Sequence, residues 1–146
     1  MRSMFLPYVM VFDEETSSWC LTGRDRSGAD FGVGAASDPD EAAVRLRDWV
    51  LDSLLAAAAD GEDRLGDLWT ECAAGDDCLV LGPTDLLPIR IRLLRVRHGW
   101  RQSEVADRLG ISQQAYAKLE RPGANPELNT LVRVERALEA PLLEYA

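Results

Sequence analysis

The stretch QSEVADRLGISQQAYAKLER, residues 102–121, decides the fold of the second half of this 146-residue chain. It contains two short helical patterns, each with its apolar residues on one face, on either side of Gly110. At this glycine the chain must turn sharply, and a side chain there would cost energy. Ala106 is small, as a close crossing of two helices requires. The apolar positions of the two patterns and the corner are Val105, Leu109, Ile111, Tyr116 and Leu119.

This arrangement predicts a helix-turn-helix whose second helix is free to enter a DNA major groove. Ser112 is expected to cap that helix, whose N-terminus favours a phosphate. Exposed glutamine can pair with adenine through two hydrogen bonds, and lysine can contact guanine or a phosphate. Tyr116 faces the core, so we expect it to pack and not to stack on bases. The predicted DNA contacts are Ser112, Gln113, Gln114 and Lys118, with Arg101, Arg121 and Asn125 as flanking phosphate contacts. For each flanking residue the alternative is a solvated side chain.

Composition limits the classes to which the chain can belong. An apolar fraction of 47% is enough for a buried core. No apolar run approaches a membrane span and no signal peptide opens the chain, so we expect a soluble cytoplasmic protein. The lone histidine, His98, and the absence of phosphate-binding glycine motifs or a metal-binding carboxylate set predict no enzyme, no cofactor and no metal. The three cysteines are expected to be buried free thiols and not a disulfide or zinc site.

Charge divides the chain into two unlike parts. Residues 1–88 carry 6 basic and 18 acidic side chains, a balance of −12, whereas residues 89–146 carry 10 basic and 7 acidic side chains, a balance of +3. The two values add to the net charge of −9. An acidic part and a basic part predict two domains with different partners, which we place at residues 1–85 and 86–146.

The first part is predicted to be a small α+β domain, an antiparallel sheet with a packed helix. Pro7 indicates either an edge strand or an irregular start for the first strand. Asp38 is expected to cap a helix that runs to about Ala59. A shorter helix is expected to follow, because apolar residues from Leu65 to Cys72 recur at helical spacing. The predicted strands are residues 5–12, 18–22, 29–33 and 78–81.

The second part is predicted to be all-helical. Leu128, Leu131, Val134 and Leu138 are expected to face the core from the fourth helix. The predicted helices are residues 89–98, 102–109, 112–121 and 128–138, with a short turn at 141–145.

The segment RVRHGWRQSEVADRLGISQQAYAKLERPGANPELNTL, residues 95–131, resembles the XRE family of helix-turn-helix domains, the class of phage repressors and Cro. The resemblance covers residues 89 to about 143. It implies that Gln102 contacts the DNA backbone and that Glu120 is structural and anchors the following loop. It also implies operator DNA as a partner, bound by a dimer because a two-fold protein reads a two-fold site. The alternative is a helical bundle that serves protein contacts only.

The acidic part resembles HicB-type antitoxins. The resemblance lies in VMVFDEETSSW (9–19), which is like their opening hairpin, and in ASDPDEAAVRLRDWVL (36–51), which is like their helix start. NTLVRVERAL (129–138) also fits the tail of the DNA-binding type, whereas RDRSGADFG (24–32) replaces their usual proline-glycine-cysteine segment.

The HicB resemblance implies a reduced RNase H-like domain without nuclease activity and a HicA-like basic ribonuclease toxin as partner. It further implies repression of the protein's own operon by a homodimer or a higher even oligomer. Two alternatives remain open. One is a one-component XRE regulator whose first domain binds a small molecule or only dimerises. The other is an active RNase H-like nuclease tethered to DNA.

Overall fold

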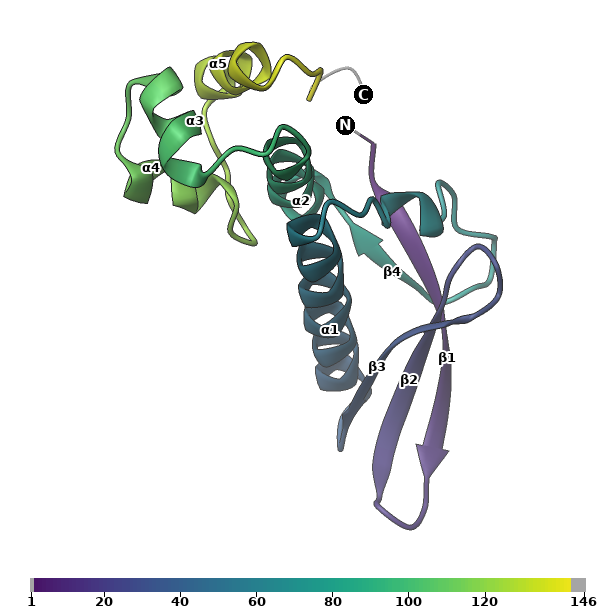
Figure 1. The fold of residues 1–146 in the computed structure, drawn as a ribbon. Helices are drawn as coiled ribbons and strands as arrows, with labels where there is room; N and C mark the ends of the chain where they lie inside the picture. The colour runs from purple at the N-terminus through teal and green to yellow at the C-terminus, as the bar shows by residue number, and fades with distance from the viewer. Residues whose placement is uncertain (1, 143–146) are drawn as a thin grey trace. The chain divides into compact units, whose positions relative to one another are not determined.

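The computed structural model describes residues 2–142, which form two compact units (Figure 1). The first, here called the sheet unit, comprises residues 3–54 and 64–81. The second, here called the helical unit, comprises residues 55–63 and 82–142 together with Arg2. The domain boundary expected between residues 85 and 86 stays a prediction.

The sheet unit is a four-stranded sheet with one long helix. Its elements are β1 (Met4–Asp13), β2 (Ser18–Arg24), β3 (Asp30–Ala36), the part of α1 (Pro39–Ala59) up to residue 54, the 3₁₀ turn η1 (Leu65–Asp67) and β4 (Cys78–Leu81). The strand order is β3-β2-β1-β4, and every pairing is antiparallel. This confirms the predicted α+β class and the predicted antiparallel sheet.

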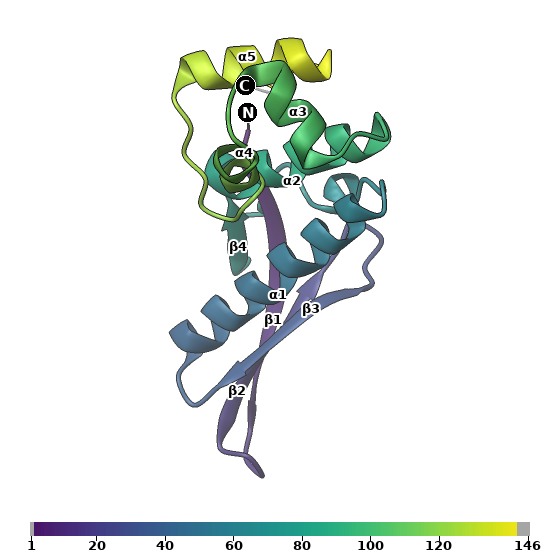
Figure 2. The same ribbon diagram turned by 60° about the vertical axis from the view of Figure 1, so that its left-hand side comes forward.

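Helix α1 lies across one face of the sheet (Figure 2). As predicted, Asp38 caps it, since its Oδ1 accepts hydrogen bonds from the backbone N–H groups of Asp40 at 2.9 Å and Glu41 at 3.0 Å. The helix approaches β3 closely at Gly34, where a Cβ atom would lie 2.2 Å from the carbonyl oxygen of Ala42. The buried stripe of α1 within this unit is Ala42, Leu46, Val50 and Leu54.

The expectation of an edge strand at Pro7 is wrong, because β1 is an inner strand. The alternative prediction, an irregular start of the first strand, agrees with the backbone hydrogen bonds of β1. Phe5 exchanges two backbone hydrogen bonds with Trp69, and the pairing with β2 begins only at Tyr8. Proline lacks a backbone donor, so it is tolerated at this gap between two partners.

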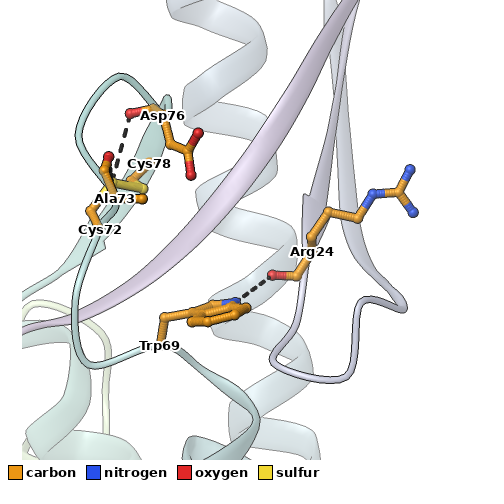
Figure 3. Close-up of a disulfide and its surroundings, with 6 residues drawn as sticks. All are labelled: Arg24, Trp69, Cys72, Ala73, Asp76 and Cys78. Carbon is orange, nitrogen blue, oxygen red and sulfur yellow. Dashed lines mark hydrogen bonds between the residues drawn. A yellow bond between two sulfur atoms is a disulfide. The ribbon is translucent and has the colours of Figure 1, made fainter.

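The region between α1 and β4 differs most from the prediction. The expected helix over residues 65–72 is reduced to η1, and Trp69 pairs with β1 instead. Cys72 and Cys78 form a disulfide, which overturns the expectation of free thiols for these two residues (Figure 3). The physical reason is a tight turn: the N–H of Asp76 donates to the carbonyl of Ala73 at 3.1 Å and brings both cysteines to a Cα separation of 6.4 Å.

The helical unit contains α2 (Pro83–Arg97), α3 (Gln102–Leu109), α4 (Gln113–Leu119) and α5 (Leu128–Leu138). The predicted bounds of α3 and α5 are confirmed, but α2 begins at Pro83 and not at Ile89. Proline is favoured at the first helical position, and the backbone N–H of Gly82 donates to the Asp85 carboxylate at 2.8 Å. These contacts extend the helix up to and across the predicted boundary between the two parts of the chain.

The core of the helical unit gathers residues from all four of its main helices. Leu128 was expected to belong to it but is 64% exposed, because the buried side of α5 starts one turn later. The predicted turn at 141–145 lies for the most part outside the described residues. None of the described helices combines the length and apolar character of a membrane span. The core residues are Leu87, Ile91, Val105, Ala106, Leu109, Tyr116, Leu119, Val134, Leu138 and Leu142.

Candidate nucleic-acid interface

The corner between α3 and α4 has the conformation that its sequence requires. Gly110 adopts a left-handed conformation with φ of 67°, which an L side chain rarely takes. The N–H of Ile111 donates to the carbonyl of Ala106 at 3.0 Å and closes the end of α3. Ala106 is buried in the core to which both helices contribute. The predicted helix-turn-helix geometry is therefore present.

Ser112 caps α4 as expected. Its Oγ accepts a hydrogen bond from the backbone N–H of Ala115 at 3.1 Å, which satisfies one of the free donors at the start of the helix. Tyr116 is fully buried, which confirms its packing role. The cap and the buried tyrosine fix which side of α4 faces solvent.

The solvent face of α4 brings four of the predicted DNA contacts together. Gln113, Gln114, Lys118 and Arg121 line one open depression of about 540 Å³, together with Ala117. All four side chains are exposed. Two amides that can both donate and accept hydrogen bonds thus lie beside two cations, the combination that can read base edges and hold phosphates.

The other predicted contacts lie outside this depression. Arg101 precedes α3, and Asn125 lies in the loop before α5; both are exposed. Gln102 is half-buried, and its Nε2 donates to a carboxylate oxygen of Glu120 at 3.0 Å. An amide nitrogen carries two hydrogens, so one remains for a phosphate. The DNA contacts of these residues stay predictions.

Glu120 is the structural centre of the helix-turn-helix. Its carboxylate is fully buried and accepts hydrogen bonds from Arg95 of α2, with Nε–Oε1 2.5 Å and Nη2–Oε2 3.0 Å. Tyr116 of α4 donates its hydroxyl at 2.8 Å, and Gln102 adds a bond from α3. The structural role expected for Glu120 is present, but the residue holds three helices together and not only the following loop.

The pKa values of this cluster follow from burial and pairing. Burial would raise the pKa of the Glu120 carboxyl, but the hydrogen bonds from Arg95, Gln102 and Tyr116 and the charge of Arg95 outweigh it, so this pKa lies below its ordinary value. Burial, and next the charge of Glu120, raise the pKa of the Tyr116 hydroxyl. Glu120 is therefore held ionised and Tyr116 protonated, which is the state that the hydrogen bond from the Tyr116 hydroxyl to the Glu120 carboxylate requires.

Sequence reasoning missed the cations of this cluster. Arg95 donates to Glu120 and, through Nη1, to the carbonyl of Trp100 at 2.8 Å, and Arg92 lies with Nε 3.5 Å from the same carboxylate. A signal existed in the sequence, because Arg95 follows Leu87 and Ile91 at helical spacing and so shares their side of α2. Among residues 2–142, no group of three or more His, Cys, Asp or Glu side chains is placed to hold a metal ion.

Two short helices joined by a left-handed turn, with a buried scaffold beneath an exposed polar face, are the arrangement of a helix-turn-helix domain. Residues 91–145 match the family model HTH_3, described as a helix-turn-helix. The match supports an XRE-type helix-turn-helix in the C-terminal part of the chain and a DNA-binding transcription regulator. No curated protein matches the chain.

Proposed function

We propose that this protein is the antitoxin of a type II toxin–antitoxin system, which represses its own operon and neutralises a HicA-like ribonuclease toxin. The proposed repression of the operon is supported by the exposed polar face of α4, which lies within the segment that matches a helix-turn-helix family. The antitoxin half rests on the charge and fold of the sheet unit together with the resemblance of its sequence to HicB-type antitoxins.

In the regulatory half, α4 enters the major groove of an operator. Gln113 and Gln114 read base edges, and Lys118 contacts a guanine or a phosphate. Arg101, Gln102, Arg121 and Asn125 contact the backbone, with Ser112 at the N-terminus of α4 near a phosphate. The protein binds as a dimer, since a palindromic operator presents two equal half-sites.

The antitoxin half depends on electrostatic attraction to a basic partner. The sheet unit, residues 3–54 and 64–81, holds 5 basic and 14 acidic side chains, a balance of −9. Such a surface attracts a cationic ribonuclease over a distance and can cover the residues with which that enzyme binds RNA. A small sheet with one helix, without a catalytic role, is compatible with such a capture domain.

The deciding experiment uses the product of the adjacent reading frame. We expect a small basic protein that co-purifies with this chain and whose ribonuclease activity the chain inhibits. Failure of the two proteins to bind would contradict the antitoxin half and favour a one-component regulator.

The two halves can be tested separately. Gln114→Ala should weaken specific operator binding by about 1–3 kcal/mol and leave toxin inhibition intact. Unchanged operator affinity in this variant would contradict the role of Gln114.

A further inference from the structure

The sheet has a second face that α1 does not cover. Side chains alternate along a strand, so the neighbours of residues buried under α1 point to the opposite side. Leu6, Leu79 and Leu81 are buried, whereas Val9, Val11 and Val80, which have the opposite parity in the same strands, are exposed. Four large apolar side chains on this opposite side are about half exposed: Val9 (48%), Val11 (58%), Val33 (47%) and Val80 (48%).

The strand register places these residues on one face of the sheet. Val9 is opposite Thr22, and Thr22 is opposite Val33, so the first row crosses β1, β2 and β3. Phe5 of β1 is opposite Val80 of β4, so these two residues form a second row on the same face of the sheet. We call this surface, made of Phe5, Val9, Val11, Val33 and Val80, the outer patch.

The outer patch is unusual for a surface that faces only water. A single exposed apolar residue is normal and needs no explanation, as with Val44 on α1, which is 56% exposed. Several exposed apolar side chains on one sheet face, from β1, β3 and β4, instead indicate a protein interaction site. Valine favours strands whichever face it is on. An antiparallel sheet with one face in water normally has polar residues on that face, so the strand preference of valine does not by itself explain the outer patch.

Charge indicates whether this surface binds a second copy of the chain or a basic protein partner. Exposed acidic residues flank it at the β1–β2 turn, with Asp13, Glu14 and Glu15, and before β4, with Asp76 and Asp77. Two sheet units at −9 each would repel if their patches met face to face. A partner with cationic residues around an apolar centre would be attracted to the rim and would bury the valines.

We propose that the outer patch is the docking surface for the basic protein partner, with apolar contacts in its centre and acidic contacts at its rim. This inference rests on the proposed function and names the surface that performs the capture. It requires that the partner present an apolar area bordered by lysine or arginine. The side of α1 that faces away from the sheet takes no part in this contact.

The test compares two variants of the patch with matched controls on α1, in the full chain. Val11→Thr combined with Val33→Thr keeps the shape and strand preference but removes apolar contact, and Val11→Arg adds a repelling charge. Val44→Thr and Val44→Arg are the controls at similar exposure. The probe is the purified product of the adjacent reading frame, titrated by calorimetry. We expect both patch variants to raise Kd at least about tenfold, while the controls and operator binding stay as in the wild type.

The outcomes separate the inference from the function on which it rests. If the wild type does not bind the probe, the proposed antitoxin function fails and the inference fails with it. If the wild type binds and the threonine double variant binds equally well, only the docking surface is wrong. If Val11→Arg halves the mass of the free protein in light scattering, the patch joins two copies of this chain and the inference is overturned. If Val11→Arg fails to fold, the binding of the Val11→Thr, Val33→Thr double variant alone tests whether the outer patch is the docking surface.

Discussion

Arg95 and Glu120 form a buried ion pair, with the guanidinium Nε 2.5 Å from the carboxylate Oε1. Arg95 belongs to α2 and Glu120 directly follows α4, so the pair fixes the end of the proposed recognition helix to the scaffold. The glutamate is fully buried, and the arginine side chain is 14% exposed. The orientation of Gln113, Gln114 and Lys118 toward DNA therefore depends on a contact that cannot itself reach DNA.

Glu120→Gln tests this scaffold. The variant leaves the Arg95 cation without a countercharge in a buried site, and removal of one partner of such a pair costs about 3–5 kcal/mol. We expect the free energy of unfolding, measured with urea, to fall by an amount in this range. Glu127→Gln, an exposed glutamate next to α5, is the control and should change stability by less than about 0.5 kcal/mol. Equal stability of the two variants would show that the pair does not hold the helices.

The low pKa of Glu120 predicts a dependence of stability on pH. A depressed pKa in the folded state means that the unfolded chain binds the proton more tightly. The stabilisation is fully present above the unfolded pKa of about 4.3 and is lost as pH falls through the lower, folded pKa. We expect the stability difference between wild type and Glu120→Gln to be constant from pH 7 to 5 and to shrink below that range. Urea titrations of both proteins at each pH measure it, and a difference independent of pH down to 2 would contradict this assignment.

The helix-turn-helix could be predicted from sequence because its determinants are local. The apolar spacing of α3, the left-handed turn at Gly110 and the cap at Ser112 each act within a few residues. The predicted bounds of α3 therefore agree with the structure, whereas α4 begins one residue later and ends two residues earlier than the predicted helix over 112–121. The shared solvent face of Gln113, Gln114 and Lys118 follows from the same periodicity. Their contacts with DNA stay predictions, because helical spacing places a side chain on a face and does not identify its ligand.

The features that sequence did not predict depend on contacts between distant segments. Nothing near Glu120 indicates that Arg95, 25 residues earlier, is its partner. Trp69 fits a helical pattern with its neighbours, yet backbone hydrogen bonds to Phe5 draw it to the sheet instead. The cysteine pair was missed because its formation depends on the turn at Ala73 and Asp76, whose geometry the spacing alone does not define.

Lys118→Ala tests whether this lysine contacts a phosphate. Each neutralised phosphate releases counterions, so loss of one contact should lower the slope of log affinity against log salt by about 1. Arg136→Ala on α5 removes the same charge from an exposed site outside the α4 face and should leave the slope nearly unchanged. Fluorescence anisotropy with operator DNA measures the slopes of both variants. A salt range of about 50 to 200 mM is wide enough to resolve the loss of one phosphate contact. A loss of operator affinity without a change of slope would place Lys118 on a base instead.

The Cys72–Cys78 disulfide should stabilise the sheet unit. In the chain-entropy description, closing a loop this short contributes about 2 kcal/mol. We expect one reactive thiol, that of Cys20, in the denatured oxidised protein and three after reduction. Reduction should also lower the free energy of unfolding by about 2 kcal/mol. The Cys72→Ser, Cys78→Ser double variant should not respond to reductant, whereas Cys20→Ser should respond as the wild type does. Three reactive thiols before reduction would contradict the disulfide.

Gly34→Ala tests the close packing of α1 on the sheet. A Cβ at this position would lie 2.2 Å from the carbonyl oxygen of Ala42 and 2.4 Å from the backbone nitrogen of Leu46. Both neighbours are backbone atoms of α1, so the whole helix would have to move. Overpacking of this kind costs about 1–3 kcal/mol, and we expect the upper part of this range.

Gly66→Ala is the matched control for this substitution, because a Cβ there meets nothing within 4 Å and the backbone is not left-handed. Thermal unfolding should therefore show a lower Tm for Gly34→Ala and an unchanged or slightly higher one for Gly66→Ala, since alanine restricts the unfolded chain. Operator binding below the Tm should survive in both variants, because the affected contacts lie within the sheet unit. An unchanged Tm for Gly34→Ala would mean that α1 does not pack on β3 at this distance.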